Sequence, residues 1–505
     1  MNETKRKVCV LTTIKWQKRE ICGCVILKNR VSSKSLKINA LLNVIKQCCA
    51  IISPMITFPY VSRMLGVEAY GKVNFSTSIV GYVTLVAGLG ISSYAVRDGS
   101  RLKSDKSKFT KFVNEVFSIN ILSTVIAYIL LGLLLLCWPE LKDYRVIIMI
   151  LSLNVLMGTL GTDWINTVYE DFLYITIRYV VCQAVVVVAT LLLINSEKDI
   201  YIYAIVLNSG NILASILNMA YIRKKIGVKP QFIVKMNLKS HFKTILILFG
   251  NSVSSTIYLY SDSSMLGVLS GDSAVGYYTV ASKIYSLIKQ LLNAITIVAI
   301  PRFSAQLALG EKNKINDQFN GMLGTLIMLV LPCVAGIVCM GKEIILLISG
   351  IEYLPAKSAL VILGVALIFS TIACLFVSVI MLAAGMEKKV LFSTTISAIV
   401  NIVLNFILIP QYSYTAAALT TLISECIIMC MGVYYTRGLI KLNIKKELFS
   451  GIVGFVWIVL LSCILKIIVL NDTIRLFVCI CLGGGTYCIL IANSLLKKNS
   501  SKKGV

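Results

Sequence analysis

The sequence is poor in the residues that most catalytic sites need. It contains one histidine, His241, and only 14% of its 505 residues are charged. A single imidazole cannot build a His-based metal site or a paired acid and base. The sequence also has no Walker A loop for nucleotide phosphates. We therefore expect no enzyme, no catalytic residues, no metal and no cofactor.

Apolar residues are abundant where charged ones are few. They make up 57% of the chain, and the mean hydropathy is +0.85, a balance that excludes a water-soluble domain of this size. Crossing a bilayer takes about 20 apolar residues, and lipid offers the backbone no hydrogen-bond partner, so such stretches must be helices. The sequence thus predicts an all-α polytopic membrane protein with about 14 transmembrane helices. They are expected at 39–60, 73–96, 112–137, 146–168, 172–194, 200–222, 244–269, 277–300, 320–341, 358–384, 390–409, 416–436, 448–469 and 474–495.

Cysteine is frequent, but its placement does not indicate a disulfide framework. Most of the 16 cysteines fall inside the predicted spans, as Cys48, Cys333 and Cys481 do. In such positions cysteine is typical of small apolar packing residues.

The net charge of +26 is distributed unevenly along the chain. With the N-terminus inside, the inner loops and the tail carry 27 Lys and Arg residues, whereas the outer loops carry 8. A bias above threefold follows the positive-inside rule and predicts that both termini are cytoplasmic. The remaining positive charge favours anionic membrane lipids over nucleic acid as a partner.

A short internal match indicates that the chain is duplicated. The sequence Met64–Val67 recurs at Met265–Val268, 201 positions later, and each copy falls where a first helix ends and a second begins. We expect two pseudo-symmetric six-helix lobes, 38–222 and 244–436, joined by the basic cytoplasmic loop 223–243. A basic cytoplasmic extension, 1–37, precedes them, and two more helices with a basic tail, 437–505, follow.

The residues around these repeats resemble a known family. The run from Phe58 to Gly66 with Tyr70 and Gly71, and the second copy with Val275 to Tyr278, are similar to signatures of Wzx-type polysaccharide flippases. So are Pro301 to Phe303 and the segment 401–425. This family belongs to the superfamily of the MATE drug exporters and the peptidoglycan precursor flippase. The resemblance covers about 36–436, and it implies a bacterial cytoplasmic membrane protein. One departure is that Ser413 and Ala416 stand where the family usually has glycines.

Polar residues on the seventh and eighth spans are the main candidates for a substrate cavity. In the eighth span Lys283, Lys289, Gln290 and Asn293 share one helical face. Charges at mid-bilayer need water, a partner or a route to the surface, so this face predicts either a cationic cavity wall or a polar seam between helices. The other candidates are Asn251 and Tyr258 of the seventh span, Lys46 of the first span, and Arg63 at its outer end, which the resemblance places toward the cavity.

Three acids inside the spans are candidates for binding a coupling ion or for pairing helices. They are Asp163, Asp262 and Glu425. Asp262 is expected to pair with a lysine of the eighth span. Asn401 and Asn405 are expected to be hydrogen-bond partners of Glu425.

Together these features predict a flippase for polyprenyl-diphosphate-linked oligosaccharides that works by alternating access between the lobes. The expected substrate is the lipid-linked oligosaccharide, and a polysaccharide polymerase is a candidate partner. The alternatives are a MATE-like multidrug exporter and a peptidoglycan precursor flippase of the same fold. Acids should dominate the cavity of an exporter of cations, and the lysines of the eighth span oppose that alternative. Because the sequence has no ATP site, we expect the direction of transport to come from an ion gradient or from consumption of the product outside.

Overall fold

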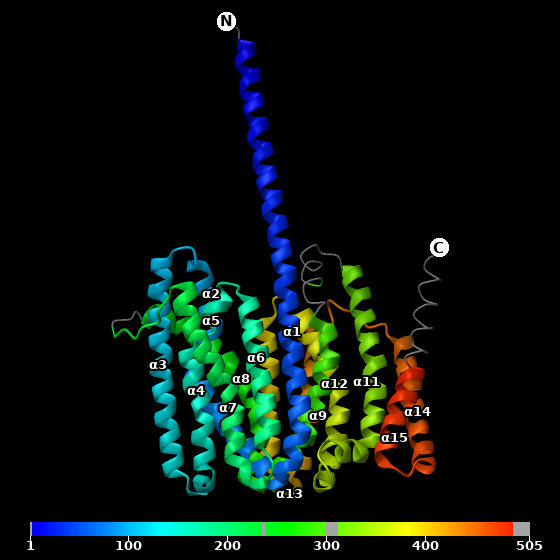
Figure 1. Cartoon of the computed structure of the whole chain (residues 1–505). Helices are drawn as coiled ribbons and strands as arrows, with labels where there is room; N and C mark the ends of the chain where they lie inside the picture. Colours follow the sequence, from blue (N-terminus) through cyan, green and yellow to red (C-terminus); the bar gives the residue numbers. More distant parts are fainter. Residues whose placement is uncertain (1–2, 235–237, 298–302, 304–311, 488–505) are drawn as a thin grey trace.

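The computed structural model is a bundle of long helices that run side by side (Figure 1). It describes the chain except residues 1–2, 235–237, 298–302, 304–311 and 488–505. Within the described residues every regular element is an α-, 3-10 or π-helix. Ten of these helices are long and apolar enough to cross a membrane. The prediction of an all-α polytopic membrane protein is confirmed.

The first half of the chain begins with α1 (Glu3–Gly88), which contains the first predicted span and most of the second, 73–96. Gly66 breaks this helix with φ 69° and ψ 177°, a backbone conformation that glycine adopts readily. Asp105 caps α3 by accepting hydrogen bonds from the backbone amides of Ser107 and Lys108. The Lys108 amide and ammonium lower the pKa of the Asp105 carboxyl.

The elements after α1 are α2 (Ile91–Leu102), α3 (Lys106–Cys137), η1 (Pro139–Tyr144), α4 (Arg145–Gly161), α5 (Trp164–Val168), α6 (Phe172–Leu193), η2 (Glu197–Asp199), α7 (Ile200–Tyr221) and η3 (Ile222–Ile226).

The second half has its own broken helix, α13 (Glu387–Thr436), which contains the eleventh and twelfth predicted spans. The break lies at Ser413, with φ 52° and ψ −134°. Serine rarely adopts this positive φ, and the position is one where the family usually has glycine. The other elements are α8 (Leu238–Ser270), α9 (Asp272–Ile297), α11 (Lys312–Ile348), η4 (Ile351–Ala356), α12 (Lys357–Cys374), η5 (Leu375–Met381), α14 (Lys445–Ile468), α15 (Asp472–Val478) and η6 (Cys479–Gly484).

The ten membrane-length helices differ from the fourteen predicted spans at identifiable places. Helix α13 runs through two predicted spans across its break, and α1 runs through one predicted span and most of the next. Helix α9 carries two lysines and is not among the ten. The predicted span 474–495 extends past the described residues, as do the end of span 277–300 and the basic tail. The count of fourteen and the two-lobed layout stay predictions.

The two copies of the repeated motif meet where α1 crosses α9. A Cβ on Gly71 would lie 1.9 Å from the Asp272 carbonyl oxygen, and one on Gly276 would lie 2.4 Å from the Val67 carbonyl oxygen. Only glycine permits so close an approach of two helix backbones. The Tyr353 hydroxyl in η4 donates to the carbonyl oxygen of Gly66 at 2.8 Å. The two halves of the chain are therefore in direct backbone contact at this crossing.

Candidate functional site

A buried ion pair lies inside the second half of the chain. The Lys289 ammonium of α9 lies 2.5 Å from Oε1 of Glu425 on α13, and the Glu425 side chain is 4% exposed. The hydroxyls of Tyr258 on α8 and Tyr285 on α9 donate to the same oxygen, at 2.5 Å and 2.9 Å. Helices α8 and α9 thus place three donors on one carboxylate oxygen of α13, an arrangement that stabilises its charge within the membrane domain.

A cavity of about 370 Å³ opens beside this pair. Lys289, Glu425, Tyr258 and Asn293 line it together, so the structure gathers four of the candidate residues at one place. Oδ1 of Asn293 is buried and has no hydrogen-bond partner. Much of the remaining wall carries hydroxyl groups, from Ser254, Ser255, Ser370, Ser378 and Thr394. Leu259, Ala373, Val377 and Ile428 form apolar parts of the wall, so the cavity has a charged end and a mixed polar and apolar lining that suits an amphipathic ligand.

The wall formed by η5 departs from regular helix. This segment, Leu375–Met381, is a π-helix that continues α12, and its residues Val377 and Ser378 line the cavity. A π-helical turn shifts the side chains that follow it, and such turns are frequent at functional sites.

Lys283 lies two turns from Lys289 on α9 and contacts the first half of the chain. Its ammonium donates to the Tyr70 hydroxyl at 2.6 Å and lies over the rings of Tyr70 and Phe58, 5.0 Å and 5.4 Å from their centroids. In the part of the chain that the structure describes, no carboxylate lies within ion-pair distance of this lysine. Lys283 is therefore held by a hydroxyl and aromatic faces, without a neutralising charge.

Asp262 lies in a separate polar network between α8, α9 and α13. Its carboxylate accepts hydrogen bonds from Thr421 at 2.7 Å, from Asn405 at 2.7 Å and from the Tyr278 hydroxyl. Asn405 also donates to Asn401 at 3.1 Å. The structure thus pairs Lys289 with Glu425 where a pair with Asp262 was expected. It also joins the two asparagines to Asp262 where Glu425 was expected. The cause is helix register, which the sequence does not reveal.

The remaining candidate cations do not reach the cavity. The Arg63 guanidinium is exposed and donates to the carbonyl oxygens of Leu346 and Leu347, in the last turn of α11. It therefore caps that helix, whose last carbonyls lack partners within it. The Lys46 ammonium lies 5.5 Å from the centre of the Tyr179 ring on α6.

Three further candidates lie elsewhere or cannot be placed. Asp163 is 64% exposed and pairs at 3.0 Å with the buried Arg178 of α6, a contact between helices. Gln290 is exposed. The side chain of Asn251 lies outside the described part of the structure.

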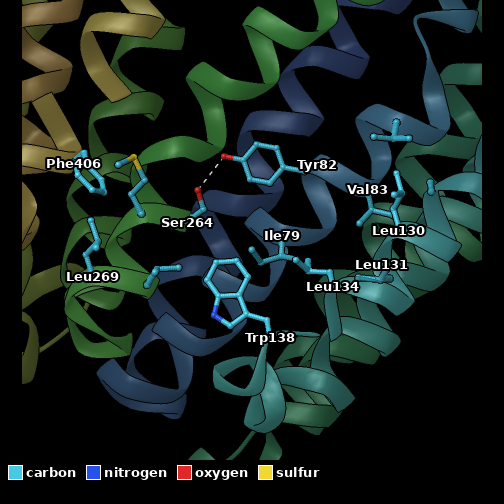
Figure 2. A pocket seen from close by; sticks show the side chains of 14 residues that line it. Ile79, Tyr82, Val83, Leu130, Leu131, Leu134, Trp138, Ser264, Leu269 and Phe406 are labelled. Atoms are coloured by element: carbon cyan, nitrogen blue, oxygen red, sulfur yellow. Dashed lines mark hydrogen bonds between the residues drawn. The ribbon is translucent and has the colours of Figure 1, made fainter. Parts of the chain in front are cut away.

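A larger cavity of about 600 Å³ is apolar and lies between α1, α3, α8 and α13. Figure 2 shows Trp138, Leu134 and Ile79 along its wall, and the hydrogen bond of 3.0 Å that joins Tyr82 to Ser264. Because this bond satisfies both hydroxyls, the cavity offers a polar ligand little to bind. It is open toward the side of the bundle that exposes Leu130 and Phe406, which are 50% and 68% exposed.

The site contains two tyrosines that were not predicted from the sequence, Tyr285 and Tyr70. Tyr285 precedes Lys289 by four residues, so both lie on one face of α9, and this spacing could have indicated the contact. Tyr70 belongs to the first signature, but its contact with Lys283 spans 213 residues and has no local signal.

Comparison with solved structures shows which proteins share this fold. The chain is similar to the lipid II flippase MurJ in an inward closed conformation, with a TM-score of 0.69 and 17% identity over 92% of this chain and 99% of that one. It is also similar to an inward-facing multidrug resistance MATE family transporter, with a TM-score of 0.60 and 15% identity over 76% and 93% of the two chains. The fold is that of these membrane transporters.

Sequence comparison then gives the family. The family described as polysaccharide biosynthesis protein matches residues 36–306, and the chain belongs to it. A protein of Escherichia coli (strain K12) assigned as an O-antigen transporter is 25% identical over 80% of this chain and 97% of its own length. A Haloferax volcanii protein assigned as the low-salt glycan biosynthesis flippase Agl15 is 23% identical over 43% of this chain and 45% of its own. The resemblance found in the sequence is confirmed.

Proposed function

We propose that this protein is a flippase that carries polyprenyl-diphosphate-linked oligosaccharides across the cytoplasmic membrane for surface polysaccharide synthesis. The observation that carries the proposal is the pair of half-buried lysines on α9, one of which lines a cavity that also carries hydroxyl groups. A lysine inside a membrane domain is costly unless it binds something. The family and the relatives assigned to O-antigen and glycan transport support this substrate class.

The headgroup of such a substrate suits the cavity together with Lys283, which lies about two turns from Lys289 on α9 and outside the cavity lining. Lys289 and Lys283 are candidates to bind the diphosphate, because fixed cations lower the cost of taking its negative charge out of water. Sugars carry many hydroxyls, which can bond to Asn293 and to the serine and threonine side chains of the wall. The polyprenyl chain stays in the bilayer. In this proposal Arg63 and Lys46 do not bind the headgroup.

Transport follows from rocking of 38–222 against 244–436 around this site. The contacts at Gly71 and Gly276 join the two halves at a crossing that the charge distribution assigns to the outer side. An inward-facing form would load the substrate from the inner leaflet. Both termini are cytoplasmic in this arrangement. Anionic lipids contact the basic inner loops, and a polysaccharide polymerase receives the product outside.

Asp262 is the candidate site for a coupling ion. Its carboxylate is surrounded by hydroxyl and amide groups and, among the described residues, has no Lys or Arg within ion-pair distance. Oxygen ligands of this kind suit a proton or a small hard cation. Asp163, which pairs with Arg178, connects helices instead.

A MATE-like exporter of cations is the less suitable alternative. Lysines beside the cavity repel a cationic drug, and Glu425 is already neutralised by Lys289. A peptidoglycan precursor flippase has the same lipid diphosphate, and only the sugars separate it from the proposed function.

The test is glycan export in a strain that lacks its own flippase. We expect export by the wild type, and none by the triple variant Lys283→Ala, Lys289→Ala, Glu425→Gln, which removes both cations without leaving an unpaired carboxylate. Lys46→Ala removes a cation outside the cavity and should export normally. Protein levels in the same membranes serve as the control for insertion. Normal export by the triple variant would refute the cationic site.

A further inference from the structure

The cation that lines the cavity is already neutralised within the protein. Lys289 lies 2.5 Å from Oε1 of Glu425, and the side chains of the two residues are 24% and 4% exposed. The pair as a whole carries no net charge. An anion that enters the cavity therefore meets an ammonium that is already paired with a carboxylate.

A diphosphate that binds Lys289 competes with Glu425 for the same ammonium, which already donates to Glu425 and to the Tyr285 hydroxyl. Both anions present oxygens to the same ammonium, and the cavity borders both residues of the pair. If the substrate takes the ammonium, the Glu425 carboxylate is left buried between α8, α9 and α13 without its cation. A buried carboxylate in that state takes up a proton in preference to staying charged.

We propose that Glu425 is a resident anion that holds the substrate's place on Lys289, and that the substrate displaces it with uptake of one proton. This rests on the proposed function, which supplies the diphosphate. The proton comes from water and forms the O–H bond of the Glu425 carboxylic acid, while the lysine stays an ammonium. When the substrate leaves, the carboxyl loses that proton and pairs with Lys289 again. The exchange links a proton to each substrate that binds.

The groups around Glu425 favour this exchange. Tyr258 on α8 and Tyr285 on α9 donate hydroxyl hydrogens to Oε1, and both hydroxyls can rotate to accept from a protonated carboxyl. From α12, the uncharged Cys374 and Ser370 complete the wall. Asp262, four residues after Tyr258, has its own hydrogen-bond network and does not contact the pair. Among the described residues, Lys289 is thus the cation within ion-pair distance of Glu425.

The experiment measures binding of geranylgeranyl diphosphate to the purified full-length protein by calorimetry, in two buffers of different ionisation enthalpy. For the wild type we expect uptake of about one proton per bound diphosphate at neutral pH. Glu425→Gln keeps the side-chain shape without the competing charge, so we expect at least about tenfold tighter binding and no proton uptake. Glu343→Gln is the matched control. It neutralises another buried acid, paired with Arg475 at 2.8 Å, far from the cavity, and should bind and take up protons like the wild type.

The outcomes separate this inference from the proposed function. Binding to Glu425→Gln that is no tighter, with proton uptake unchanged, would overturn the role of Glu425 and leave the flippase proposal standing. Binding only to Glu425→Gln, without proton uptake, would support the resident anion. Lys289→Met with Glu425→Gln should lose the added affinity, and equal affinity in this variant would show that the diphosphate does not bind at the pair. Failure of both the wild type and Glu425→Gln to bind would overturn both ideas.

Discussion

The two ring nitrogens of His241 join it to two helices of the first half of the chain. Nε2 lies 2.9 Å from a carboxylate oxygen of Glu115 on α3, and Nδ1 lies 2.5 Å from the Tyr94 hydroxyl on α2. All three side chains are buried. The one histidine of the sequence therefore connects the start of α8 to α2 and α3.

Replacing His241 should destabilise the protein. His241→Phe keeps the aromatic contacts with Tyr94 and Phe112 but leaves the buried Glu115 without its partner, at a cost of about 1 to 3 kcal/mol. We expect a lower Tm in detergent, with His241→Gln intermediate because its amide can still hydrogen-bond. Tyr128→Phe removes a half-buried hydroxyl contact inside the first half and serves as a control for hydrogen-bond loss alone. A Tm equal to that of the wild type in His241→Phe would show that the contact contributes nothing.

Ser413→Gly should stabilise the protein. Ser413 has φ 52° and ψ −134°, a sparsely populated conformation that costs a residue with a Cβ about 1 to 3 kcal/mol. Ser413 lies at the break in α13 and not within a regular helical turn. Replacing it with glycine therefore relieves backbone strain and does not weaken a regular stretch of helix. Thermal unfolding should show a higher Tm. A fall in Tm would mean that the Ser413 side chain, or the smaller conformational freedom of serine in the unfolded chain, stabilises the protein by more than the strain costs.

Gly71→Ala should weaken the crossing of α1 and α9. The added methyl would lie 1.9 Å from a backbone oxygen, so the helices must separate, and overpacking of this kind costs about 1 to 3 kcal/mol. Gly132→Ala in α3 is the matched control, since a Cβ there meets open space and alanine is the better helix former. We expect Tm to fall in the first variant and hold or rise in the second. The same Tm in both would show that the close approach is absent in the membrane protein.

Lys289→Met should be harmful alone and tolerated together with Glu425→Gln. Lys289→Met leaves a buried carboxylate unpaired, and breaking a buried pair in this way costs about 3 to 5 kcal/mol. The double variant has no charge at the site, so its level in membranes should recover toward the wild type while glycan export stays lost. Quantitative blotting of membranes with an export assay checks both points. A double variant with less protein than Lys289→Met alone would exclude this pairing.

Much of the architecture could be predicted from the sequence, because the constraints of the bilayer act locally. Apolar length and charged breaks indicate helices without any knowledge of packing. The break at Gly66 falls inside the repeated motif that marked a helix end. The second copy of the motif likewise ends just before Gly271, where α8 gives way to α9.

Partners within the site were harder to predict, because they depend on the rotation of each helix against its neighbours. Helical spacing placed Lys289 and Asn293 on one face, but the same spacing could not choose between Asp262 and Glu425 as the partner of Lys289. Arg63 shows the same limit. Its place in the signature was clear, yet its contact with the end of α11 joins residues more than 280 positions apart.

The most direct test of the proposed function uses the purified protein in liposomes that contain a polyprenyl-diphosphate-linked oligosaccharide. A glycan-modifying enzyme outside the liposomes reports which leaflet the headgroup occupies. We predict that wild-type protein exposes headgroups from the inner leaflet faster than protein-free liposomes do. The triple variant Lys283→Ala, Lys289→Ala, Glu425→Gln should match the protein-free rate. Wild-type protein that leaves the inner-leaflet pool protected, at a level of reconstitution verified in the same liposomes, would contradict the proposed flippase activity.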